Sequence, residues 1–582
     1  MITKYLFLFT ISPVQAFISQ ARKAQDLFAG SQLLTDITRY AIGEFNNDTN
    51  DKAVIIFPAK WEKKYNAALP NRFMAEIECD SKDVLLIGGK LEQKVKAYFE
   101  QLAEQVFLKQ AKGQSKPIGF DAQIENHLIV HWVFEEFKNR SYLETFNVIE
   151  SNLGSIKNIR EFKQLPDTEW GRKDNLSGEL NALFFNKKFG KKPAYTDSAI
   201  SISAPSSLLS SGEGLSAISL TKRFYNYKRT DSFPSTAEIA HLDIKEDIEK
   251  SGSFKLFKGI VQDDFDYQLL YKDNLNVKYF EKQGIEFPTD NNSLLQLHND
   301  IFKELKAIDK KQKKYYVILI FDGDDMGKWL SGKALGEKQK NDTYLKQYHH
   351  RFSELLAIFA KSAKEYVDKN NYGRTIFAGG DDFLAMLNLN NAFDVVVELR
   401  NKFNKEVSKA LKNEYSEIKE DVNFSAGLAI AHYQHPLDDV LNNAREMEKK
   451  AKSVDRKDAL AITVLKHSGE QQKMVMKWGD NQTNLKSIIN IVNSLTQKDF
   501  SPAFIENLNQ VFQVFVGSEK PEELFDIFKL ESGAFIKKAK MPKANALKVE
   551  ELKKDIDNLY NVLDLENTLE ALNIIDFIYR KA

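Results

Sequence analysis

The chain has 582 residues, more than one hydrophobic core normally serves, so about three to five structural units are expected. Its 82 basic and 82 acidic residues give a formal net charge of +0, which excludes a protein whose whole surface is basic and binds nucleic acid. The single cysteine excludes a disulfide framework and a zinc site built from cysteines of this chain. No apolar stretch has the length of a membrane-spanning helix, and we expect a cytoplasmic protein with no membrane partner.

The first 165 residues alternate between strand and helix patterns. The elements expected here are a buried strand at 5–11, a helix at 14–45, strands at 53–57 and 72–77, and a helix from about 90 to 110. This unit has no paired aspartates at a glycine turn. We therefore expect residues 1–165 to form an α+β unit without an acidic motif.

Residues 166–310 differ in composition from the first unit, and their pattern predicts a helical, loop-rich middle unit. A serine-rich stretch covers 201–216, and a mixture of basic and aromatic residues follows at 222–229. That mixture is typical of a half-solvated amphipathic segment, although the same residue types also stack on nucleotides. Both interpretations stay open for 222–229.

The third unit, 311–470, contains two acidic motifs at strand ends. A buried strand at 315–321 runs into Asp322-Gly-Asp-Asp-Met-Gly-Lys328, and Gly379-Gly-Asp-Asp382 separates two short apolar segments. A strand at 422–430 and a helix at 437–452 complete the unit. The remaining residues, 471–582, show only helical patterns, predicting a C-terminal helical bundle with a lysine-rich surface at 537–554.

Three carboxylates are predicted to meet at these strand ends: Asp322, Asp381 and Asp382. Oxygen ligands without histidine or cysteine suit Mg²⁺ or Mn²⁺ bound together with substrate phosphates. Gly323, Gly379 and Gly380 are expected to allow a sharp turn and close approach of a nucleotide to the backbone. Such a site predicts metal-dependent nucleotidyl transfer, whereas the hairpin alone is also an ordinary turn. Asp324 and Asp325 are weaker candidates because a loop of this composition is often solvated.

These two motifs resemble the large, polymerase-palm subunit of type III-B CRISPR effector complexes, the Cmr-type relatives of GGDEF cyclases. Further stretches agree with the resemblance: Ile11 to Ile18, Ala21 to Lys23, Asp26-Leu27 and Gly30-Ser31 at the start, and Phe233 to Thr236 in the middle. The resemblance covers residues 1 to about 470. It implies an α+β fold with two ferredoxin-like palm domains, a helical middle insert and a C-terminal helical bundle.

The resemblance also implies two groups of nucleotide-binding residues. Lys452 and Arg456 match the cations that hold the distal phosphates in GGDEF-like palms, and two solvated cations remain the alternative. The first palm, which lacks acids, would position the second substrate, with Gly30 and Ser31 as contact points. Helix packing explains that Gly-Ser pair equally well.

Two departures from the family pattern carry expectations of their own. The chain starts at the palm and has no His-Asp dipeptide, so we expect a form without the HD nuclease domain and without DNA cleavage by this subunit. Ser216 and Ser219 stand where zinc-binding cysteines would be, so we expect no zinc and a middle unit held by packing.

The function implied is that of an RNA-activated nucleotidyltransferase that converts ATP into an adenylate second messenger, a cyclic oligoadenylate. The implied partners are other Cmr-type subunits, crRNA and target RNA. One alternative is transfer of AMP from ATP to S-adenosylmethionine at the same site. Two other classes remain open: a non-catalytic scaffold that binds nucleotide, and a free-standing diguanylate cyclase that uses GTP without RNA.

Overall fold

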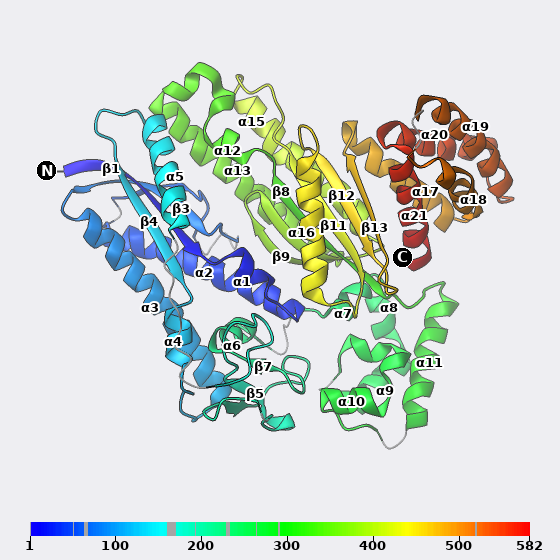
Figure 1. Ribbon diagram of the computed structural model, residues 1–582, viewed down its shortest axis with the longest axis horizontal. Coiled ribbons are helices and arrows are strands. Elements are labelled where there is room, and N and C mark those ends of the chain that lie inside the picture. The colour runs from blue at the N-terminus through cyan, green and yellow to red at the C-terminus, as the bar shows by residue number, and fades with distance from the viewer. Residues whose placement is uncertain are drawn as a thin grey trace.

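The protein has an α+β fold, shown as a computed structural model in Figure 1. The structure describes residues 2–50, 52–62, 68–159, 170–192, 194–228, 233–262, 265–288, 291–517 and 521–582. Two larger sheets lie side by side, and helices cover them. Helix α2 of the first unit packs against strand β9 of the second, so the two sheets belong to one packed body.

The first unit contains a four-stranded antiparallel sheet in the order β2-β3-β1-β4. Its elements are β1 (Ile2–Ser12), α1 (Gln15–Ser19), α2 (Ala24–Asp48), β2 (Val54–Phe57), β3 (Arg72–Asp80), α3 (Val84–Ala111), α4 (Phe120–Glu125), β4 (Ile129–Glu136) and α5 (Tyr142–Asn158). This strand and helix order is the ferredoxin-like one. The alternation seen in the sequence arises because every second residue of a strand faces the core.

The single helix predicted at 14–45 is wrong, because the chain breaks between α1 and α2. The Asp26 carboxylate accepts hydrogen bonds from the backbone amides of Arg22 and Lys23, each at 3.0 Å, and so begins a new helix. The buried Lys222 ammonium binds the carbonyl oxygens of Phe17, Ile18 and Gln20 just before this break.

The middle region contains helices and a small sheet. Its elements are β5 (Phe184–Asn186), β6 (Ile200–Ile202), β7 (Gly214–Leu215), α6 (Ala217–Phe224), α7 (Thr236–Ala240), α8 (Lys245–Lys250), α9 (Gly252–Val261), α10 (Val277–Gln283) and α11 (Asn291–Ala307). The prediction of a helical, loop-rich insert omitted the three-stranded sheet β6-β5-β7. For residues 222–229 we predict either a half-solvated amphipathic segment or stacking on nucleotides. Both predictions are wrong for Lys222 and Arg223, which are buried.

The second unit repeats the ferredoxin-like order and then extends it. Its elements are β8 (Tyr315–Gly323), α12 (Met326–Leu330), α13 (Asp342–Lys369), β9 (Gly373–Gly379), β10 (Asp382–Asn388), α14 (Ala392–Phe403), α15 (Lys409–Glu414), β11 (Phe424–His432), α16 (Leu437–Ser453), β12 (Ala459–Leu465) and β13 (Gln471–Lys477). The sheet order is β13-β12-β11-β8-β10-β9. Helix α16 crosses over between the parallel strands β11 and β12 and covers one face of the sheet (Figure 1).

Strand β13 corrects the prediction that residues from 471 onward are wholly helical. It pairs with β12 over its full length, and its residues alternate between exposed or half-buried and buried positions. In the part of the chain that the structure describes, the α-helices that follow are α17 (Thr483–Thr496), α18 (Ala503–Phe512), α19 (Pro521–Ala539), α20 (Ala546–Val562) and α21 (Leu565–Lys581). Helix α21 packs on β13 and joins this bundle to the sheet.

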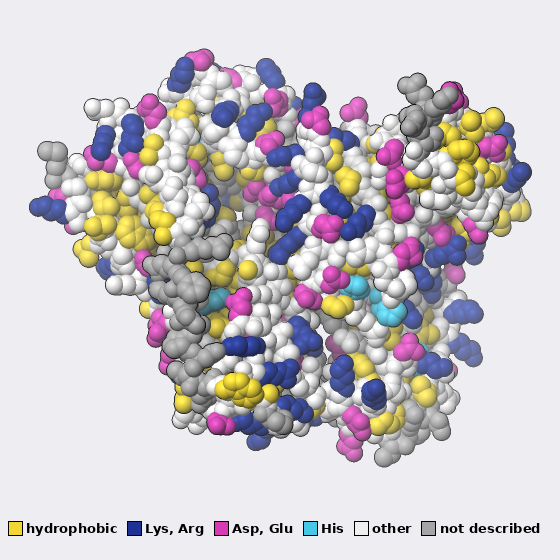
Figure 2. All heavy atoms as spheres, in the orientation of Figure 1, with side chains coloured by type: hydrophobic (Ala, Val, Ile, Leu, Met, Phe, Trp, Pro, Cys, Tyr) yellow, Lys and Arg dark blue, Asp and Glu magenta, His cyan; other side chains and the backbone are white. Residues whose placement is uncertain are grey.

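The surface in Figure 2 mixes basic and acidic side chains over the visible face, in line with the balanced composition. Hydrophobic side chains gather over the C-terminal helices at the upper right of that view. Among the residues described, no helix combines the length and the apolar character needed to cross a membrane.

Candidate active site

The register of the second sheet brings the predicted acids together. Strand β10 pairs antiparallel with β8 so that Phe383 lies opposite Phe321. Continuing this register by one residue places Asp382 opposite Asp322. Both strands are buried along most of their length, and their acids are the first residues at this end to reach solvent. The sheet therefore aligns residues about 60 positions apart in the chain.

The turn between β9 and β10 is a two-residue hairpin turn. Gly379 pairs with Asp382, which leaves Gly380 and Asp381 as the central residues. Gly380 has a φ of 76°, and Asp381 is absent from the residues with positive φ. Glycine at the first central position is typical of a type II′ turn, whose twist matches that of the paired strands. This geometry turns the Asp381 side chain back over the end of β8.

Gly323 allows the closest approach at the site. A Cβ atom built on Gly323 would lie 2.9 Å from the Cβ of Asp381 and 2.6 Å from the sulfur of Met326. Any side chain at 323 would therefore push the hairpin away from β8. Gly379 is equally constrained, because its Cβ would lie 2.3 Å from the Phe377 ring. These two glycines set the spacing of the acids.

Crowding of the carboxyl groups changes their proton affinity. Burial and the charge of Asp322 raise the pKa of Asp381 to about 7, and the two side chains lie within hydrogen-bonding distance. Burial, together with the charges of Asp322, Asp381 and Glu448, raises the pKa of Asp382 to about 8. Ionised carboxylates in a poorly solvated place repel each other. When all of these carboxyl groups are ionised, the site holds more negative charge than the Lys452 ammonium beside them neutralises.

The donor set fits a divalent cation, although Lys452 competes for one ligand. Carboxylate oxygens are what Mg²⁺ and Mn²⁺ prefer, and the excess negative charge favours such an ion. In the described part of the chain no three His, Cys, Asp or Glu side chains are arranged as ligands around one ion. At the acid site the Lys452 ammonium contacts the Asp322 carboxylate. A cation would therefore bind as Lys452 leaves Asp322.

The neighbouring acids Asp324 and Asp325 do not join this cluster. Asp324 is buried, accepts hydrogen bonds from Ser425 and from the backbone amide of Asp458, each at 3.0 Å, and so ties β8 to β11 and β12. Asp325 has a φ of 54° and forms an ion pair with Lys457 at 2.5 Å. Their roles in the structure are local.

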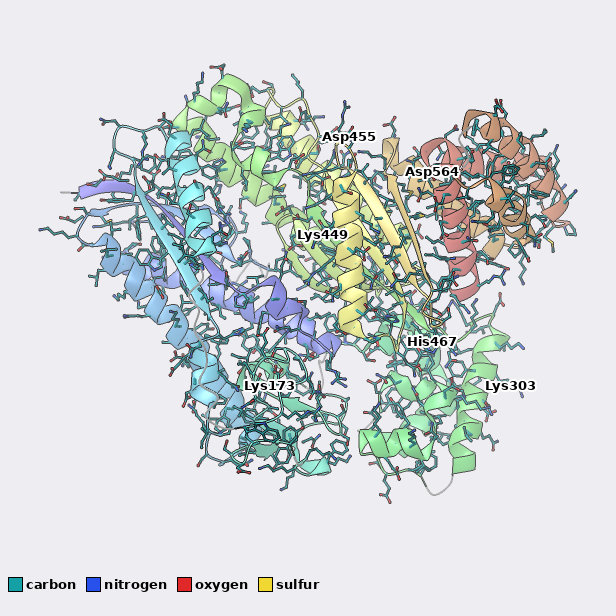
Figure 3. All side chains as sticks on the ribbon, viewed as in Figure 1. Lys173, Lys303, Lys449, Asp455, His467 and Asp564 are labelled. Atoms are coloured by element: carbon teal, nitrogen blue, oxygen red, sulfur yellow. The ribbon has the colours of Figure 1, made fainter. Side chains whose placement is uncertain are left out.

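Of the two predicted phosphate-binding cations, the structure brings only Lys452 to the acids. Helix α16 ends at Ser453, and Arg456 follows in a loop with a φ of 57° and a side chain that is 91% exposed. The expected spacing of one helical turn between the two cations is therefore wrong. Figure 3 shows Asp455 in the same loop, at the opposite end of α16 from His467.

Two further residues of α16 reach the site, and the sequence motifs did not indicate them. Glu448 lies 3.2 Å from the Lys452 ammonium, and its charge contributes to the raised pKa of Asp382. Arg445 is partly buried and interacts electrostatically with the Asp382 carboxylate. It also donates a 3.5 Å hydrogen bond to the Gln15 carbonyl of α1. The four-residue spacing between Glu448 and Lys452 is the one sequence signal that could have indicated Glu448.

A cavity of about 760 Å³ lies between the two units. It is lined by α2, α3, the end of α6 and strand β9, up to Ala378 immediately before the acidic hairpin. Ser31 lines this cavity, whereas Gly30 faces Lys222, whose Cε would lie 2.8 Å from a Cβ at residue 30. Gly30 therefore serves the packing of α2 on α6.

A larger crevice of about 1270 Å³ lies at the other end of the second sheet. It is lined by residues such as Arg374, at the start of β9, and Tyr433, just after β11. Because β11 runs antiparallel to β8, this end is remote from Asp322. Neither cavity is lined by Asp322, Asp381 or Asp382, and the smaller one reaches Ala378, the residue before Gly379 of the acidic hairpin.

Ser216 and Ser219, which stand where related proteins would have zinc-binding cysteines, share one hydrogen-bond acceptor. Both hydroxyl groups donate to the same carboxylate oxygen of Asp174, Ser216 at 2.6 Å. The other oxygen of Asp174 accepts hydrogen bonds from Ser177 and Gly178. A hydrogen-bonded carboxylate thus adds to the packing that we expected to hold this region.

Two family models match separate stretches of the chain. Residues 315–461 match the family model of the Cas10/Cmr2 second palm domain, and residues 6–105 match that of the N-terminal domain of the CRISPR-associated protein Cmr2. The chain is 34% identical to the CRISPR system Cmr subunit Cmr2 of Pyrococcus furiosus over 246 residues, which are 40% of this chain and 27% of that relative. It thus matches about a quarter of that relative's length.

Two solved structures are similar over nearly the whole chain. A chain of type III-B Cmr-beta bound to cognate target RNA gives a TM-score of 0.69 at 14% identity, covering 99% of this chain and 83% of that one. The apo state of type III-B Cmr-beta gives a TM-score of 0.65 at 14% identity, covering 99% and 82%. At this identity the likeness concerns the fold.

Proposed function

We propose that this chain, which is similar to Cas10/Cmr2 proteins over residues 6–105 and 315–461, is the nucleotidyltransferase subunit of a type III-B CRISPR effector complex. The complex would contain other Cmr-type subunits and crRNA, and target RNA would switch the site on. The substrate would be ATP and the product a cyclic oligoadenylate. The observation that carries this proposal is the convergence of Asp322, Asp381 and Asp382 at one end of the second sheet.

The reaction proposed is attack of a ribose 3′-hydroxyl on the α-phosphorus of ATP. The O3′–P bond forms, the bond from the α-phosphorus to the bridging oxygen breaks, and pyrophosphate leaves. The hydroxyl proton passes to solvent. Mg²⁺ or Mn²⁺ would supply stabilisation of charge on the attacking and leaving oxygens. Asp322, Asp381 and Asp382 would hold the ions, and Lys452 would bind the distal phosphates once it leaves Asp322.

The cavity beside the hairpin suits the second substrate. Tyr40 and Tyr98 stack at a centroid distance of 4.0 Å along its wall, and Gln32 and Gln105 add amide groups. Aromatic faces and amide groups are what recognise a nucleoside base. Ser31 is the predicted contact on this side, and it lies on the same wall. Holding the acceptor here would bring its ribose towards Asp381.

Product analysis with labelled ATP tests this proposal. The full chain in its assembled complex is incubated with Mg²⁺ or Mn²⁺, with and without target RNA and S-adenosylmethionine. We expect oligoadenylate and pyrophosphate that depend on target RNA, and loss of both when Asp381 and Asp382 are replaced by Asn. Asp325→Asn is the matched control, because Asp325 follows the same strand but pairs with Lys457.

The other functional classes give different products. An adduct that appears only with S-adenosylmethionine would indicate transfer of AMP to that acceptor. Turnover of GTP without RNA would indicate a diguanylate cyclase. Assembly and RNA binding without any nucleotide product would indicate a scaffold. Each of these results would replace the proposal.

A further inference from the structure

Glu448 is a fourth carboxylate at the acid site, and its partner there is Lys452. The two residues are four apart on α16 and face the same side of the helix, with 3.2 Å between the Glu448 Oε1 and the Lys452 Nζ. The same ammonium contacts Asp322 and lies 3.5 Å from the carbonyl oxygen of Gly323. One lysine therefore bridges a strand carboxylate and a helix carboxylate.

Close packing of α16 on the sheet fixes the position of Glu448. A Cβ built on Gly427 of β11 would lie 2.3 Å from the backbone nitrogen of Glu448 and 2.3 Å from the carbonyl oxygen of Ala444. The Glu448 side chain is only 15% exposed. The helix backbone thus touches the strand at this residue, which leaves Glu448 little freedom to withdraw from Lys452.

We propose that Glu448 is a positioning residue that keeps the Lys452 ammonium at the site when a divalent cation takes Asp322. The inference rests on the proposed function. A divalent ion held by Asp322 would repel an ammonium group that shares the same carboxylate. Lys452 then retains Glu448 and the Gly323 carbonyl. Held there, the ammonium faces the place of the distal phosphates.

Nucleotide binding to the full chain in its assembled complex tests this role. Calorimetric titration with Mn²⁺ compares a non-hydrolysable ATP analogue with AMP, which lacks the distal phosphates. We expect Glu448→Gln to weaken binding of the analogue about three- to tenfold, as loss of charge at one charge-assisted hydrogen bond implies. Binding of AMP should change less than about twofold, the effect of an exposed ion pair.

A matched control and a double-mutant comparison test whether Glu448 acts through Lys452. Glu446 forms the same kind of pair with Lys450, at 3.1 Å on the same helix, and also contacts Lys473. Glu446→Gln should leave binding of both ligands unchanged. Adding Glu448→Gln to Lys452→Met should cause no further loss, because the carboxylate acts through the lysine.

Other outcomes overturn the inference. Equal weakening of the analogue and AMP would indicate a merely structural role, and losses that add to those of Lys452→Met would separate the two residues. Loss of Mn²⁺ binding itself would make Glu448 a ligand. Wild-type protein that binds the analogue but forms no product would refute the proposed function while the test of Glu448 stands. Wild-type protein that binds no analogue would refute both.

Discussion

Replacing Asp382 by Asn is expected to stabilise the protein at alkaline pH in the absence of divalent ions. Burial and neighbouring carboxylates raise the pKa of Asp382 to about 8, whereas an unfolded chain gives about 3.9. The folded state therefore binds this proton more tightly than the unfolded state. The resulting stabilisation is complete below about pH 4 and is lost as the pH rises towards 8. Asn binds no proton and escapes this loss.

The magnitude follows from the raised pKa. A difference of about four pH units corresponds to at most about 5 kcal/mol at pH 8. The side chain is partly open to solvent, and screening by water reduces the expected gain to about 2 kcal/mol. For a unit of this size that is about 4–8 °C in the unfolding midpoint. At pH 4.5 the gain should fall to about 0.4 kcal/mol.

Thermal unfolding in EDTA between pH 4.5 and 8.5 measures this difference. Asp325→Asn is the control, because it removes an ion pair with Lys457 at the end of the same strand without relieving the crowded acids. Mn²⁺ at pH 8 should stabilise wild type more than the variant, by about 2.7 kcal/mol at a hundredfold excess over its Kd. An Asp382→Asn protein that is less stable than wild type at pH 8 without metal would refute the reasoning.

Three further changes test other parts of the structure. Asp26→Asn removes the carboxylate that pairs with the buried Arg223 guanidinium and should lower the free energy of unfolding by about 3–5 kcal/mol. A loss below about 1 kcal/mol in thermal unfolding would contradict this pairing. Gly380→Ala should cost about 1 kcal/mol and lower ATP turnover, whereas Gly113→Ala, at a similar φ of 80°, should lower stability without affecting turnover. Replacing Ser216 and Ser219 by Ala should cost about 2 kcal/mol, and zinc chelation of wild type should leave its midpoint unchanged.

The acid site was predictable because its determinants are local. A buried strand leading into Asp322, and a glycine pair leading into Asp381 and Asp382, each carry their own signal in the sequence. The meeting of the two motifs then follows from a ferredoxin-like sheet, in which β8 and β10 are neighbours. The ferredoxin-like sheet itself was predicted from the resemblance to palm subunits.

The rest depended on contacts between distant residues. The break between α1 and α2 requires Asp26 and Lys222, which are far apart in the sequence. Strand β13 has a weak apolar pattern and gains its structure by pairing with β12. Tertiary pairing overrides local preference in both cases.

The end of α16 explains why Arg456 was misplaced. Residues 456–458 all have positive φ, although none is glycine. Asp458 is held there by the Arg400 guanidinium and by its own amide, which donates to Asp324. These contacts end the helix before Arg456, and no local sequence signal marks them. Glu448 lies on the same helix, and no sequence motif indicates that it reaches the acids.

Anomalous scattering from Mn²⁺ in crystals of the complex with a non-hydrolysable ATP analogue tests the central claim most directly. We expect one or two manganese peaks at about 2.2 Å from carboxylate oxygens of Asp322, Asp381 and Asp382, with the Lys452 ammonium moved from Asp322 to the distal phosphates. A bound analogue without manganese at these three residues would contradict the account, as would manganese held elsewhere in the chain.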